Sequence, residues 1–434
     1  MTETTERIVN LGLLGCGTVG GSLVELVQGR ADDIAARTGV RLRVARIAVR
    51  SLDVDRGLDV DPSVFTVDAA SLVVDPGVDV VVEVMGGIDP ARDLIAAALR
   101  AGKPVVSANK ELLAAAGAEL FELADTSGVD LLFEAAVAGG IPFIRPLRES
   151  LVGEDVIRVM GIINGTTNYI LTKMTEEGWS YADALAEAQA LGYAEADPTA
   201  DVEGFDAGAK AAIIATIAFG VGVTAADVHH EGISTVTADD IEAAGRLGYQ
   251  IKLLAVAERF DDASVAVRVH PTMVPVTHPL ASVRDSFNAV FVEGAAVGDL
   301  MFYGRGAGGF PTASAVLGDV VDAAVNVVKG THASLGSFGQ AVLRPQDDLD
   351  SAFYLIVEVV DRPGVLANVA GVFGANGVSI RSMEQSALAD DGAARLMFIT
   401  HTARESDVQH TLEALRALDV VRSVDSVIRV IGPS

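Results

Sequence analysis

The stretch of sequence that decides the fold is RIVNLGLLGCGTVGGSLVELVQ, residues 7–28. An apolar run over 7–14 predicts a strand, the glycine-rich residues 15–20 predict a turn, and the apolar spacing from Ser22 onward predicts a helix. Strand, glycine turn and helix in this order are typical of a nucleotide-binding unit in an α/β protein. We therefore expect the N-terminal part of the chain to bind a nucleotide.

The glycine turn suits a bound dinucleotide. Gly15 permits a tight bend, Gly17 lets a pyrophosphate approach the backbone, and Gly20 lets the helix pack on the strand. The helix N-terminus offers free N–H groups to phosphates, so Thr18 and Val19 are further cofactor candidates. A glycine turn can also be purely structural, and the strand and helix around it are what favour the nucleotide.

The end of the second predicted strand bears on which dinucleotide binds. Residues 42–49 end at Arg50, where folds that bind NAD usually carry Asp or Glu for the ribose 2′-hydroxyl. An arginine suits a 2′-phosphate, so we expect NADP(H) to be preferred, with NAD(H) also open. The alternative interpretation of Arg50 is a solvated surface side chain.

Two more buried parallel strands are predicted, over 79–85 and 103–108, because both runs are almost continuously apolar. Ligands of doubly wound sheets gather outside the carboxyl ends of the strands. Gly86, Ser107 and Lys110 follow those ends and are expected beside the cofactor. For Lys110 alone, a solvent-exposed helix start is an equal alternative. The fold class we expect is α/β, beginning with a Rossmann-like doubly wound nucleotide domain.

A second domain, of α+β type, is predicted from residue 131 onward. A strand over 157–163 leads into NGTTN, residues 164–168. This motif is typical of a turn with a helix N-cap, but its N–H and hydroxyl groups could equally hold a substrate carboxylate. Asn164 and Thr166 are the candidates for that contact.

The most informative stretch for catalysis is residues 192–223. Asp206 and Lys210 are four residues apart on a helix that is apolar nearly all round, so we expect the pair to be buried or to line a cleft. Burial lowers the pKa of a lysine, which favours proton donation near neutral pH. A structural ion pair is the alternative. Glu195 lies in an acidic turn that is either a solvated loop or part of the site.

A second glycine-rich loop, residues 304–309, precedes a helical run that extends to about residue 328. Gly306 and Gly308 would let the backbone approach a ligand. Pro311 is predicted at the first helical position, which would point a second helix N-terminus at the site.

The C-terminal part has a pattern of its own. After a predicted linker rich in Gly, Ser, Pro and Asp, strands and helices alternate as βαββαβ, which predicts a small antiparallel sheet with helices on one face. This part carries no catalytic constellation, so we expect it to be regulatory. The predicted domains are a nucleotide domain (1–130, completed by 304–330), a substrate and dimerisation domain (131–303), the linker (331–351) and a regulatory domain (352–434).

Composition excludes several classes of function. The 434 residues include 32 Lys and Arg against 59 Asp and Glu, a net charge of −27, which disfavours nucleic acid and anionic membranes as partners. A single cysteine, Cys16, excludes an intrachain disulfide. No targeting segment is visible, and the most apolar stretch, 211–223, is too short to span a bilayer. We expect a cytoplasmic protein.

In this order the motifs resemble homoserine dehydrogenase, in its bacterial form with a C-terminal ACT domain. The resemblance covers nearly the whole chain. It rests on GCGTVG (15–20), SANK (107–110), EAAVAGGIP (134–142), NGTTN (164–168), GYAEADP (192–198), DVEGFDAGAK (201–210), GRGAGGFPTASAV (304–316) and DRPGVLANVAGVFGANGVSI (361–380).

The resemblance implies reversible, NAD(P)H-dependent reduction of L-aspartate 4-semialdehyde to L-homoserine, in the biosynthesis of threonine, methionine and isoleucine. It implies that Lys210 donates the proton to the aldehyde oxygen and that Lys110 lines the reacting centre beside the nicotinamide. Asp206 would orient Lys210 or a substrate group. Glu195 would bind the substrate through its α-ammonium group.

The resemblance also implies a cation, an effector and an assembly. A sodium ion would be held, mostly by carbonyl oxygens, at Glu134, Val137, Gly139 and Ile141. The ACT domain would bind an amino-acid effector, threonine being usual in the family, around Asp361, Gly364 and Val365. A homodimer or homotetramer is expected, with a second ACT unit completing the effector pocket.

Two other functions fit parts of the sequence. One is a non-catalytic sensor that keeps the nucleotide fold for binding only, and the intact Lys110 and Lys210 argue against it. The other is an oxidoreductase for another small amino-acid-like alcohol, which the generic parts of the site would allow.

Overall fold

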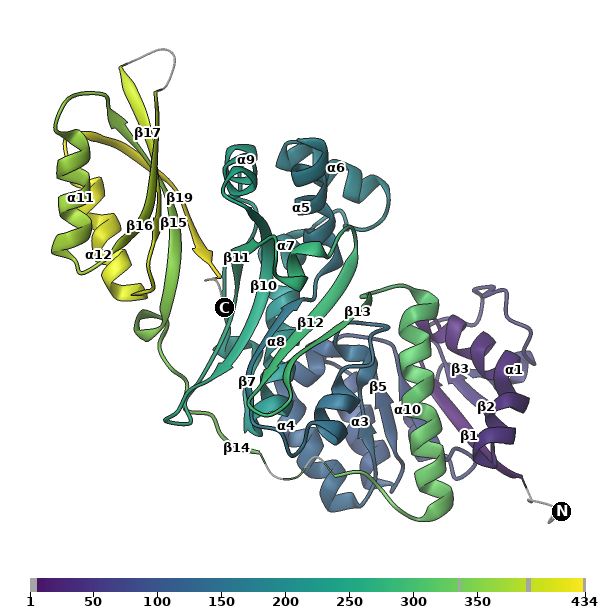
Figure 1. Ribbon diagram of the computed structural model, residues 1–434. Helices are drawn as coiled ribbons and strands as arrows, with labels where there is room; N and C mark the ends of the chain where they lie inside the picture. The colour runs from purple at the N-terminus through teal and green to yellow at the C-terminus, as the bar shows by residue number, and fades with distance from the viewer. Residues whose placement is uncertain (1–5, 335, 337, 388–391, 432–434) are drawn as a thin grey trace.

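The computed structural model describes residues 6–334, 336, 338–387 and 392–431. Figure 1 shows the chain progressing from the N-terminal parallel sheet, through a central region of long strands and helices, to the C-terminal unit at the opposite end of the molecule. In the described residues the strands form a six-stranded sheet, an eleven-stranded sheet and a two-stranded sheet.

The N-terminal sheet is a Rossmann-like parallel sheet, as predicted. Its strand order is β3-β2-β1-β4-β5-β6, so the order reverses between β1 and β4, and this is the point where such sheets bind ligands. Its strands are β1 (Arg7–Leu14), β2 (Val40–Ala48), β3 (Phe65–Thr66), β4 (Val80–Glu83), β5 (Val105–Ser107) and β6 (Leu131–Leu132), and its helices are α1 (Thr18–Thr38), α2 (Ala69–Val74), α3 (Ala91–Arg100) and α4 (Lys110–Ser127).

The apolar run over 131–137 has the pattern of a strand, but only its first two residues form one. β6 ends at Leu132, and Glu134–Ala136 form a 3₁₀ turn. The Glu134 carboxylate accepts hydrogen bonds from the backbone N–H groups of Phe143 and Ile144, at 2.5 and 2.6 Å, so the chain turns back on itself here. The apolar spacing of these residues is typical of a strand, but the strand ends before Glu134 because its buried carboxylate binds the returning chain.

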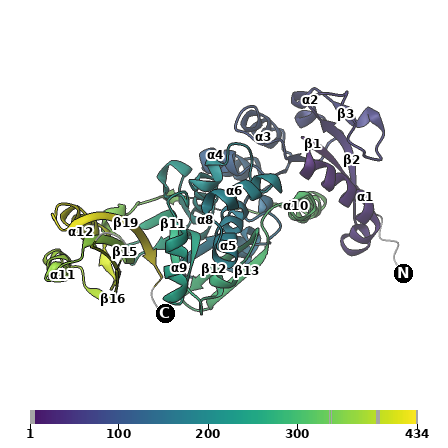
Figure 2. The ribbon, with the colours of Figure 1, turned by 90° about the horizontal axis from the view of Figure 1, so that it is seen from above.

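Helix α10 (Gly309–Lys329) completes the nucleotide unit although it comes late in the chain. Its buried residues Val316 and Val320 share one core with β1, β2 and α1, and Figure 2 shows it near α1 and β1. The helix begins at Gly309, so Pro311 lies in its third position and not in the first. By length and composition alone α10 is long and apolar enough to cross a membrane, and about a third of its most apolar stretch is buried inside the structure.

The central region is built on long strands of the eleven-stranded sheet. Strands β10 and β11 are buried over most of their length, because side chains on both faces enter apolar cores. The elements are β7 (Val156–Ile162), α5 (Gly165–Glu177), α6 (Tyr181–Ala190), α7 (Thr199–Val202), α8 (Phe205–Phe219), β8 (Val221–Gly222), β9 (His229–His230), α9 (Ala238–Arg246), β10 (Tyr249–Arg259), β11 (Val265–Pro275), β12 (Phe287–Gly294) and β13 (Gly298–Arg305).

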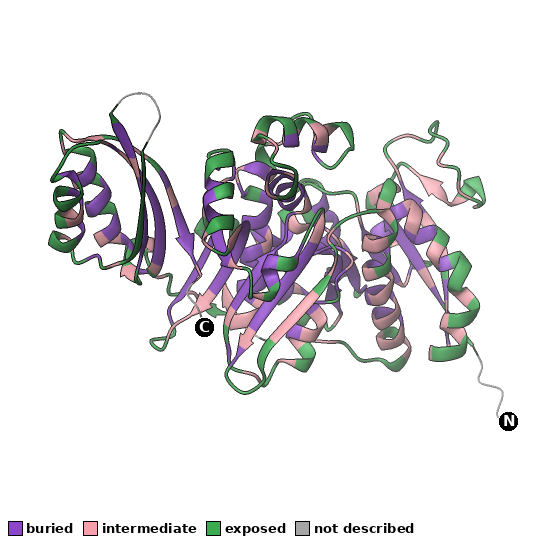
Figure 3. Ribbon diagram, turned by 45° about the horizontal axis from the view of Figure 1, so that its top comes forward, coloured by how far each residue is buried: buried purple, intermediate pink, exposed green. Residues whose placement is uncertain are grey.

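The C-terminal unit has the predicted βαββαβ order, preceded by β14 (Gly339–Gln340), which pairs with β8. Its antiparallel strands follow the order β19-β15-β17-β16, and helices α11 and α12 cover one face, with exposed outer surfaces (Figure 3). The elements are β15 (Asp350–Val360), α11 (Val365–Ala375), β16 (Ile380–Ala387), β17 (Ala393–Thr400), β18 (Ala403–Arg404), α12 (Glu405–Arg416) and β19 (Val421–Val430).

This C-terminal sheet is not separate from the central one, which the sequence did not predict. Strand β19 pairs in parallel with β11 through Thr272↔Arg429 and Met273↔Val430. The second face of the sheet also contributes Tyr354 and other residues to the core of the central region. The C-terminal unit is therefore joined to the central region both through strand pairing and through a shared core.

Candidate active site

One carboxylate holds two lysines at the centre of the candidate site. Asp206, in the first turn of α8, lies 2.6 Å from Nζ of Lys210 through Oδ2 and 2.5 Å from Nζ of Lys110 through Oδ1. The Asp206 side chain is only 6% exposed and that of Lys210 12%, whereas Lys110 is 37% exposed. The predicted Asp206–Lys210 pair is present, and Lys110, from a distant part of the sequence, joins it.

Local structure explains how α8 presents these groups. Gly204 precedes the helix with φ 84°, a left-handed conformation that glycine adopts without strain. The chain therefore turns sharply enough to place Asp206 in the first helical turn, where the helix dipole stabilises a negative charge. One turn later, Lys210 also donates a hydrogen bond to the carbonyl of Ile163, at 2.8 Å, just after β7. The ammonium group is thus fixed between α8 and the end of a strand.

The three charges stabilise one another. Burial by itself raises the pKa of Asp206, but Lys210 and Lys110 outweigh it and hold this pKa well below its usual range. Burial likewise lowers the pKa of Lys110, but the adjacent Asp206 carboxylate, together with Asp201 and Glu111, raises it by more, so the net shift is upward. The cluster therefore contains a carboxylate that stays ionised, and Lys110 stays an ammonium group that can donate hydrogen bonds.

Asn164 connects the lysine cluster to a second acid. Its Nδ2 donates to Asp206 Oδ2 at 2.9 Å and to Asp201 Oδ1 at 2.6 Å, while its Oδ1 caps α5 by accepting from the N–H of Thr167. Thr166 donates to the Tyr193 carbonyl at 2.7 Å and contacts Asp201 Oδ2 at 3.1 Å. Asp201 was missed in the sequence, where it is one of several acids in a short stretch.

Glu195 follows the loop after α6 and is exposed. Its carbonyl accepts a hydrogen bond from Gln189 at 3.0 Å. The loop is tied to α5 two residues earlier, where Thr166 donates to the Tyr193 carbonyl. Glu195 thus lies on a loop fastened to the candidate site, with its own side chain facing solvent.

The glycines of the N-terminal turn have different surroundings. A Cβ on Gly15, where φ is 101°, would lie 2.9 Å from the Val84 carbonyl oxygen, and one on Gly20 would lie 2.6 Å from the Gly15 oxygen. A Cβ on Gly17 would meet nothing within 4 Å. Gly17 is also the N-cap of α1 and has no side-chain cap. Two glycines are thus required by packing, and the third leaves the helix N-terminus open.

The ends of β4 and β5 are fastened by a buried carboxylate, Glu83, that was not predicted from the sequence. Glu83 accepts from the N–H of Met85 at 2.9 Å, from the N–H of Gly86 at 3.1 Å and from the hydroxyl of Ser107 at 2.7 Å. Its signal was the one acid in an otherwise apolar strand. Ser107 is buried, whereas Gly86 is exposed, after the end of β4 where the strand order reverses. Lys110 begins α4 shortly after the end of β5, so the lysine cluster lies next to this edge of the sheet.

The second glycine loop brings α10 to the same edge. A Cβ on Gly309 would lie 2.7 Å from the Ser22 hydroxyl, so the start of α10 contacts the start of α1. Gly308 is exposed, with φ 120°, whereas Gly306 is packed so closely on Asn288 that a Cβ there would overlap the amide. Arg50 is exposed immediately after β2.

The loop expected to hold a cation is buried and sharply turned. Ala138 and Gly139 both have left-handed backbone, with φ 56° and 55°. In the described part of the chain, no hydrogen bond is found on the carbonyl oxygens of Val137, Gly139 or Ile141. The Glu134 carboxylate, by contrast, accepts from backbone N–H groups. The loop therefore offers carbonyl oxygens and not a cluster of acids, and the described residues contain no group of three or more His, Cys, Asp or Glu suited to a metal.

The predicted effector residues line one cavity of the C-terminal unit. Asp361, Gly364 and Val365 surround a space of about 390 Å³ between the end of β15 and the start of α11. Gly364 is the N-cap of α11 and has φ 90°. The three residues are thus brought together by the strand-to-helix turn.

Comparisons with known proteins agree along the whole chain. Family models for homoserine dehydrogenase, for its NAD-binding domain and for the ACT domain match residues 142–321, 15–134 and 353–420. The homoserine dehydrogenase of Corynebacterium glutamicum is 52% identical over 97% of this chain and 95% of its own, and that of Mycobacterium tuberculosis is 50% identical over 98% of both.

Solved structures give the same result. A homoserine dehydrogenase from Thiobacillus denitrificans superposes with a TM-score of 0.92 and 40% identity over 98% of both chains. A hyperthermophilic archaeal homoserine dehydrogenase in complex with NADPH has a TM-score of 0.64 and 30% identity, over 74% of this chain and 98% of that one.

Proposed function

We propose how the site works from one premise: the chain belongs to the homoserine dehydrogenase family. It is an oxidoreductase of amino-acid biosynthesis that interconverts L-aspartate 4-semialdehyde and L-homoserine, and it carries an NAD-binding domain and a C-terminal ACT domain. The fold and the contacts of individual side chains then suggest a role for each residue of the site.

The dinucleotide binds, in our proposal, across the N-terminal turn. Gly15, Gly17, Thr18, Val19 and Gly20 would hold the pyrophosphate, and the open face of Gly17 and the uncapped N-terminus of α1 support this. Further contacts would come from Gly86, Ser107, Gly306 and Gly308. When bound, the nicotinamide supplies or accepts the hydride.

We also propose that the dinucleotide is NADP(H) in preference to NAD(H), and this proposal rests on Arg50. This exposed guanidinium follows β2, where it would meet a ribose 2′-phosphate.

Reduction of the aldehyde needs a proton for the carbonyl oxygen. The single observation that carries our assignment is that Asp206 bridges two lysines at 2.5 and 2.6 Å. Lys210 would donate the proton, and Lys110 would stabilise negative charge that develops on the same oxygen. Asp206 would keep both ammonium groups in place. No imidazole is required.

The amino-acid end of the substrate is assigned to the neighbouring polar residues. Glu195 would bind the α-ammonium group, with Asn164, Thr166 and Asp206 beside it. The Thr166 hydrogen bond to Tyr193 supports this, because it fastens the Glu195 loop to the site.

A sodium ion is proposed at Glu134, Val137, Gly139 and Ile141. The buried loop fits a monovalent cation because carbonyl oxygens without hydrogen-bond partners are suitable ligands for it. The ion would fix the loop on which Gly139 contacts Gly306, at the edge of the cofactor site.

For regulation, we propose an amino-acid effector, threonine, in the cavity lined by Asp361, Gly364 and Val365. A homodimer or homotetramer would place a second ACT unit beside this cavity. A location in the cytoplasm also stays a prediction.

The test of the catalytic assignment is an assay that follows NADPH absorbance with aspartate semialdehyde. Lys210→Ala should lower kcat by about 10²–10⁴-fold, the usual contribution of a positioned general acid. Lys173→Ala, which removes a lysine paired with Glu177 outside the cluster, is the matched control and should keep full activity. An unimpaired Lys210→Ala enzyme would show that another group donates the proton.

A further inference from the structure

Three buried polar residues join the ends of β4 and β5 to the start of α4. They are Glu83, Ser107 and Asn109, which are 0%, 0% and 4% exposed. The Ser107 hydroxyl donates to Glu83 Oε2 at 2.7 Å and accepts from the backbone N–H of Asn109 at 3.1 Å. The three residues therefore form one network along the edge of the sheet where we propose that the cofactor binds.

The network holds the turn after β4 at two points. Glu83 Oε1 accepts from the N–H groups of Met85 and Gly86, at 2.9 and 3.1 Å, and Asn109 Nδ2 donates to the carbonyl of Gly87 at 2.6 Å. A Cβ on Gly86 would meet nothing within 4 Å. The turn is thus fastened from its inner side, and its outer side is open to a ligand.

The same network fixes the start of the helix that carries Lys110. Asn109 is the N-cap of α4, and its Oδ1 accepts from the N–H of Leu112 at 3.1 Å. Lys110 is the first residue of this helix and pairs with Asp206 in the candidate site. One side chain, Asn109, therefore contacts the cofactor turn through Nδ2 and sets the position of Lys110 through Oδ1.

The order of donors and acceptors in the network depends on the carboxylate of Glu83. The Ser107 hydroxyl gives its proton to this carboxylate, so its oxygen can accept from the N–H of Asn109. An amide at position 83 would point an N–H group at the hydroxyl and take away the acceptor of its proton. Because a buried donor without a partner is unfavourable, Glu83→Gln should disturb the whole network.

We propose that Glu83 and Asn109, linked through Ser107, are positioning residues for hydride transfer. They hold the turn at 84–87, beside the nicotinamide end of the cofactor, at a fixed distance from the ammonium group of Lys110. They act through that turn and through Lys110 and do not touch the substrate. This inference rests on the roles proposed above for the cofactor edge and for Lys110, and adds that the two are set by one network.

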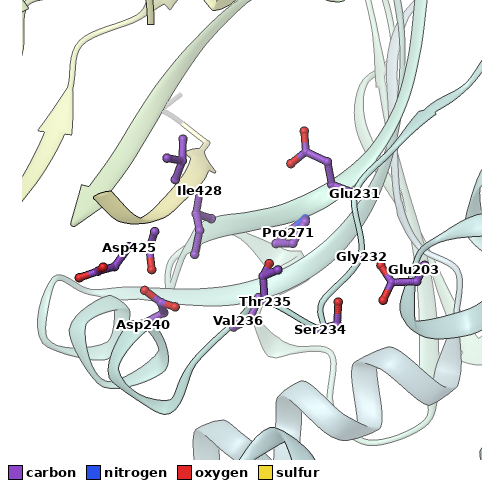
Figure 4. Close-up of a pocket in the computed structure, with 12 residues that line it drawn as sticks. Glu203, Glu231, Gly232, Ser234, Thr235, Val236, Asp240, Pro271, Asp425 and Ile428 are labelled. Atoms are coloured by element: carbon purple, nitrogen blue, oxygen red, sulfur yellow. The ribbon is translucent and has the colours of Figure 1, made fainter. Parts of the chain in front are cut away.

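The test compares Glu83→Gln with a matched buried acid, Asp240. This side chain is 1% exposed and accepts from the N–H and the hydroxyl of Thr237, at 2.9 and 2.7 Å, so it resembles Glu83 in burial and in partners. Asp240 belongs to α9, where it lines a cavity of about 240 Å³ next to the C-terminal unit (Figure 4). Asp240→Asn therefore removes a buried carboxylate without changing the network.

NADPH binding is measured by fluorescence titration, kcat by steady-state kinetics and Tm by thermal unfolding. We expect Glu83→Gln to raise the Kd for NADPH about tenfold and to lower kcat about 10–100-fold, because a small misplacement of the reacting groups is enough to slow the reaction. Asp240→Asn should lower Tm and leave both Kd and kcat unchanged. If the two variants change Kd and kcat equally, the proposal is overturned.

Asn109→Ser tests the network even if Glu83→Gln does not fold. Serine is also a good N-cap, so α4 should keep its start and Tm should change little, but the shorter side chain cannot reach the carbonyl of Gly87. We expect a weaker affinity for NADPH and a lower kcat in this variant. Unchanged values of both would overturn the role of Asn109.

A double variant tests whether Glu83 acts through Lys110. Glu83→Gln should lower kcat much less in a Lys110→Gln enzyme than in the unchanged chain, since residues that act through one group are not additive. Equal factors in the two backgrounds would overturn the coupling. A fully active Lys110→Gln enzyme would instead overturn the role proposed for Lys110, and the Kd for NADPH, which needs no turnover, would still report on the network.

Discussion

Buried and partly buried lysines occur in two kinds of surroundings in this enzyme, and the two differ in charge. At the candidate active site, Lys110 and Lys210 share Asp206. On β10, Lys252 is 3% exposed and donates to the carbonyl of Val283 at 2.5 Å and to Asn168 Oδ1 at 3.3 Å, both neutral groups. Burial lowers the pKa of Lys252 to about 8, whereas Asp206 raises that of Lys110.

The difference teaches that burial alone does not decide the charge of a lysine. A carboxylate within hydrogen-bond distance compensates for the loss of water, whereas neutral oxygens do so only in part. The charges of the cluster at the candidate active site are therefore balanced by its own residues. Lys252 pairs only with neutral groups and is the lysine most easily deprotonated of those whose pKa is shifted.

Asp206→Asn is expected to have the largest effect, because it removes the partner of two ammonium groups at once. Breaking a buried charge pair on one side typically costs about 3–5 kcal/mol, part of which the half-buried Lys110 recovers from water. We expect kcat to fall about 10³-fold or more and the free energy of unfolding to drop, measured by steady-state kinetics and urea titration. Asp197→Asn, a change at an exposed acid, is the control. If the two variants were equally stable, Asp206 would not be needed to compensate the charges of the two lysines.

Lys110→Gln removes one of the two ammonium groups and keeps the Asp206–Lys210 pair. Loss of one group that stabilises charge on the substrate oxygen usually costs about 10²–10³-fold in kcat. We expect a decrease in that range with little change in the urea midpoint. If KM rises while kcat is unchanged, Lys110 binds substrate without assisting the reaction.

Lys252 should make stability depend on alkaline pH. Its pKa in the folded chain, about 8, is below its ordinary value of 10.5, so between these values the unfolded chain binds more protons. Stability should therefore rise from pH 8 to 10.5, by about 2–3 kcal/mol. Lys252→Met should remove this rise in pH-dependent unfolding. The same slope in both proteins would show that Lys252 titrates normally.

Glu231 should have the smallest effect. Burial would raise its pKa, but His229 and Arg429 lower it to about 2 from the ordinary 4.5. The contribution of Glu231 to the free energy of unfolding is therefore complete above pH 4.5 and is lost as the pH falls through 2. The side chain is 39% exposed, so after solvent screening we expect only about 1 kcal/mol. Glu231→Gln should reduce the dependence of the free energy of unfolding on acidic pH. If this dependence is unchanged in the variant, the contact between Glu231 and Arg429 does not stabilise the folded chain.

Local pattern was enough to predict the N-terminal fold. The glycine turn, the apolar strands and the βαββαβ order all involve neighbours in sequence, whose spacing reflects the period of a helix or strand. The Asp206–Lys210 pair was predictable for the same reason, since four residues separate the two on one helix face.

Contacts between distant residues were not predictable in this way. Lys110 meets Asp206 only because the end of β5 faces the start of α8, and β19 pairs with β11 across 157 residues, from Thr272 to Arg429. Periodicity does not encode which strand edges meet.

The position of α10 in the chain has a consequence for synthesis. The N-terminal sheet is complete at Leu132, but the helix that covers its apolar side ends only at Lys329. At roughly 5–20 residues per second, a ribosome needs about 10–40 s to make the intervening residues. During that time the nascent domain exposes Leu23, Val24 and their neighbours, so a fragment ending near residue 134 should aggregate unless a chaperone holds it.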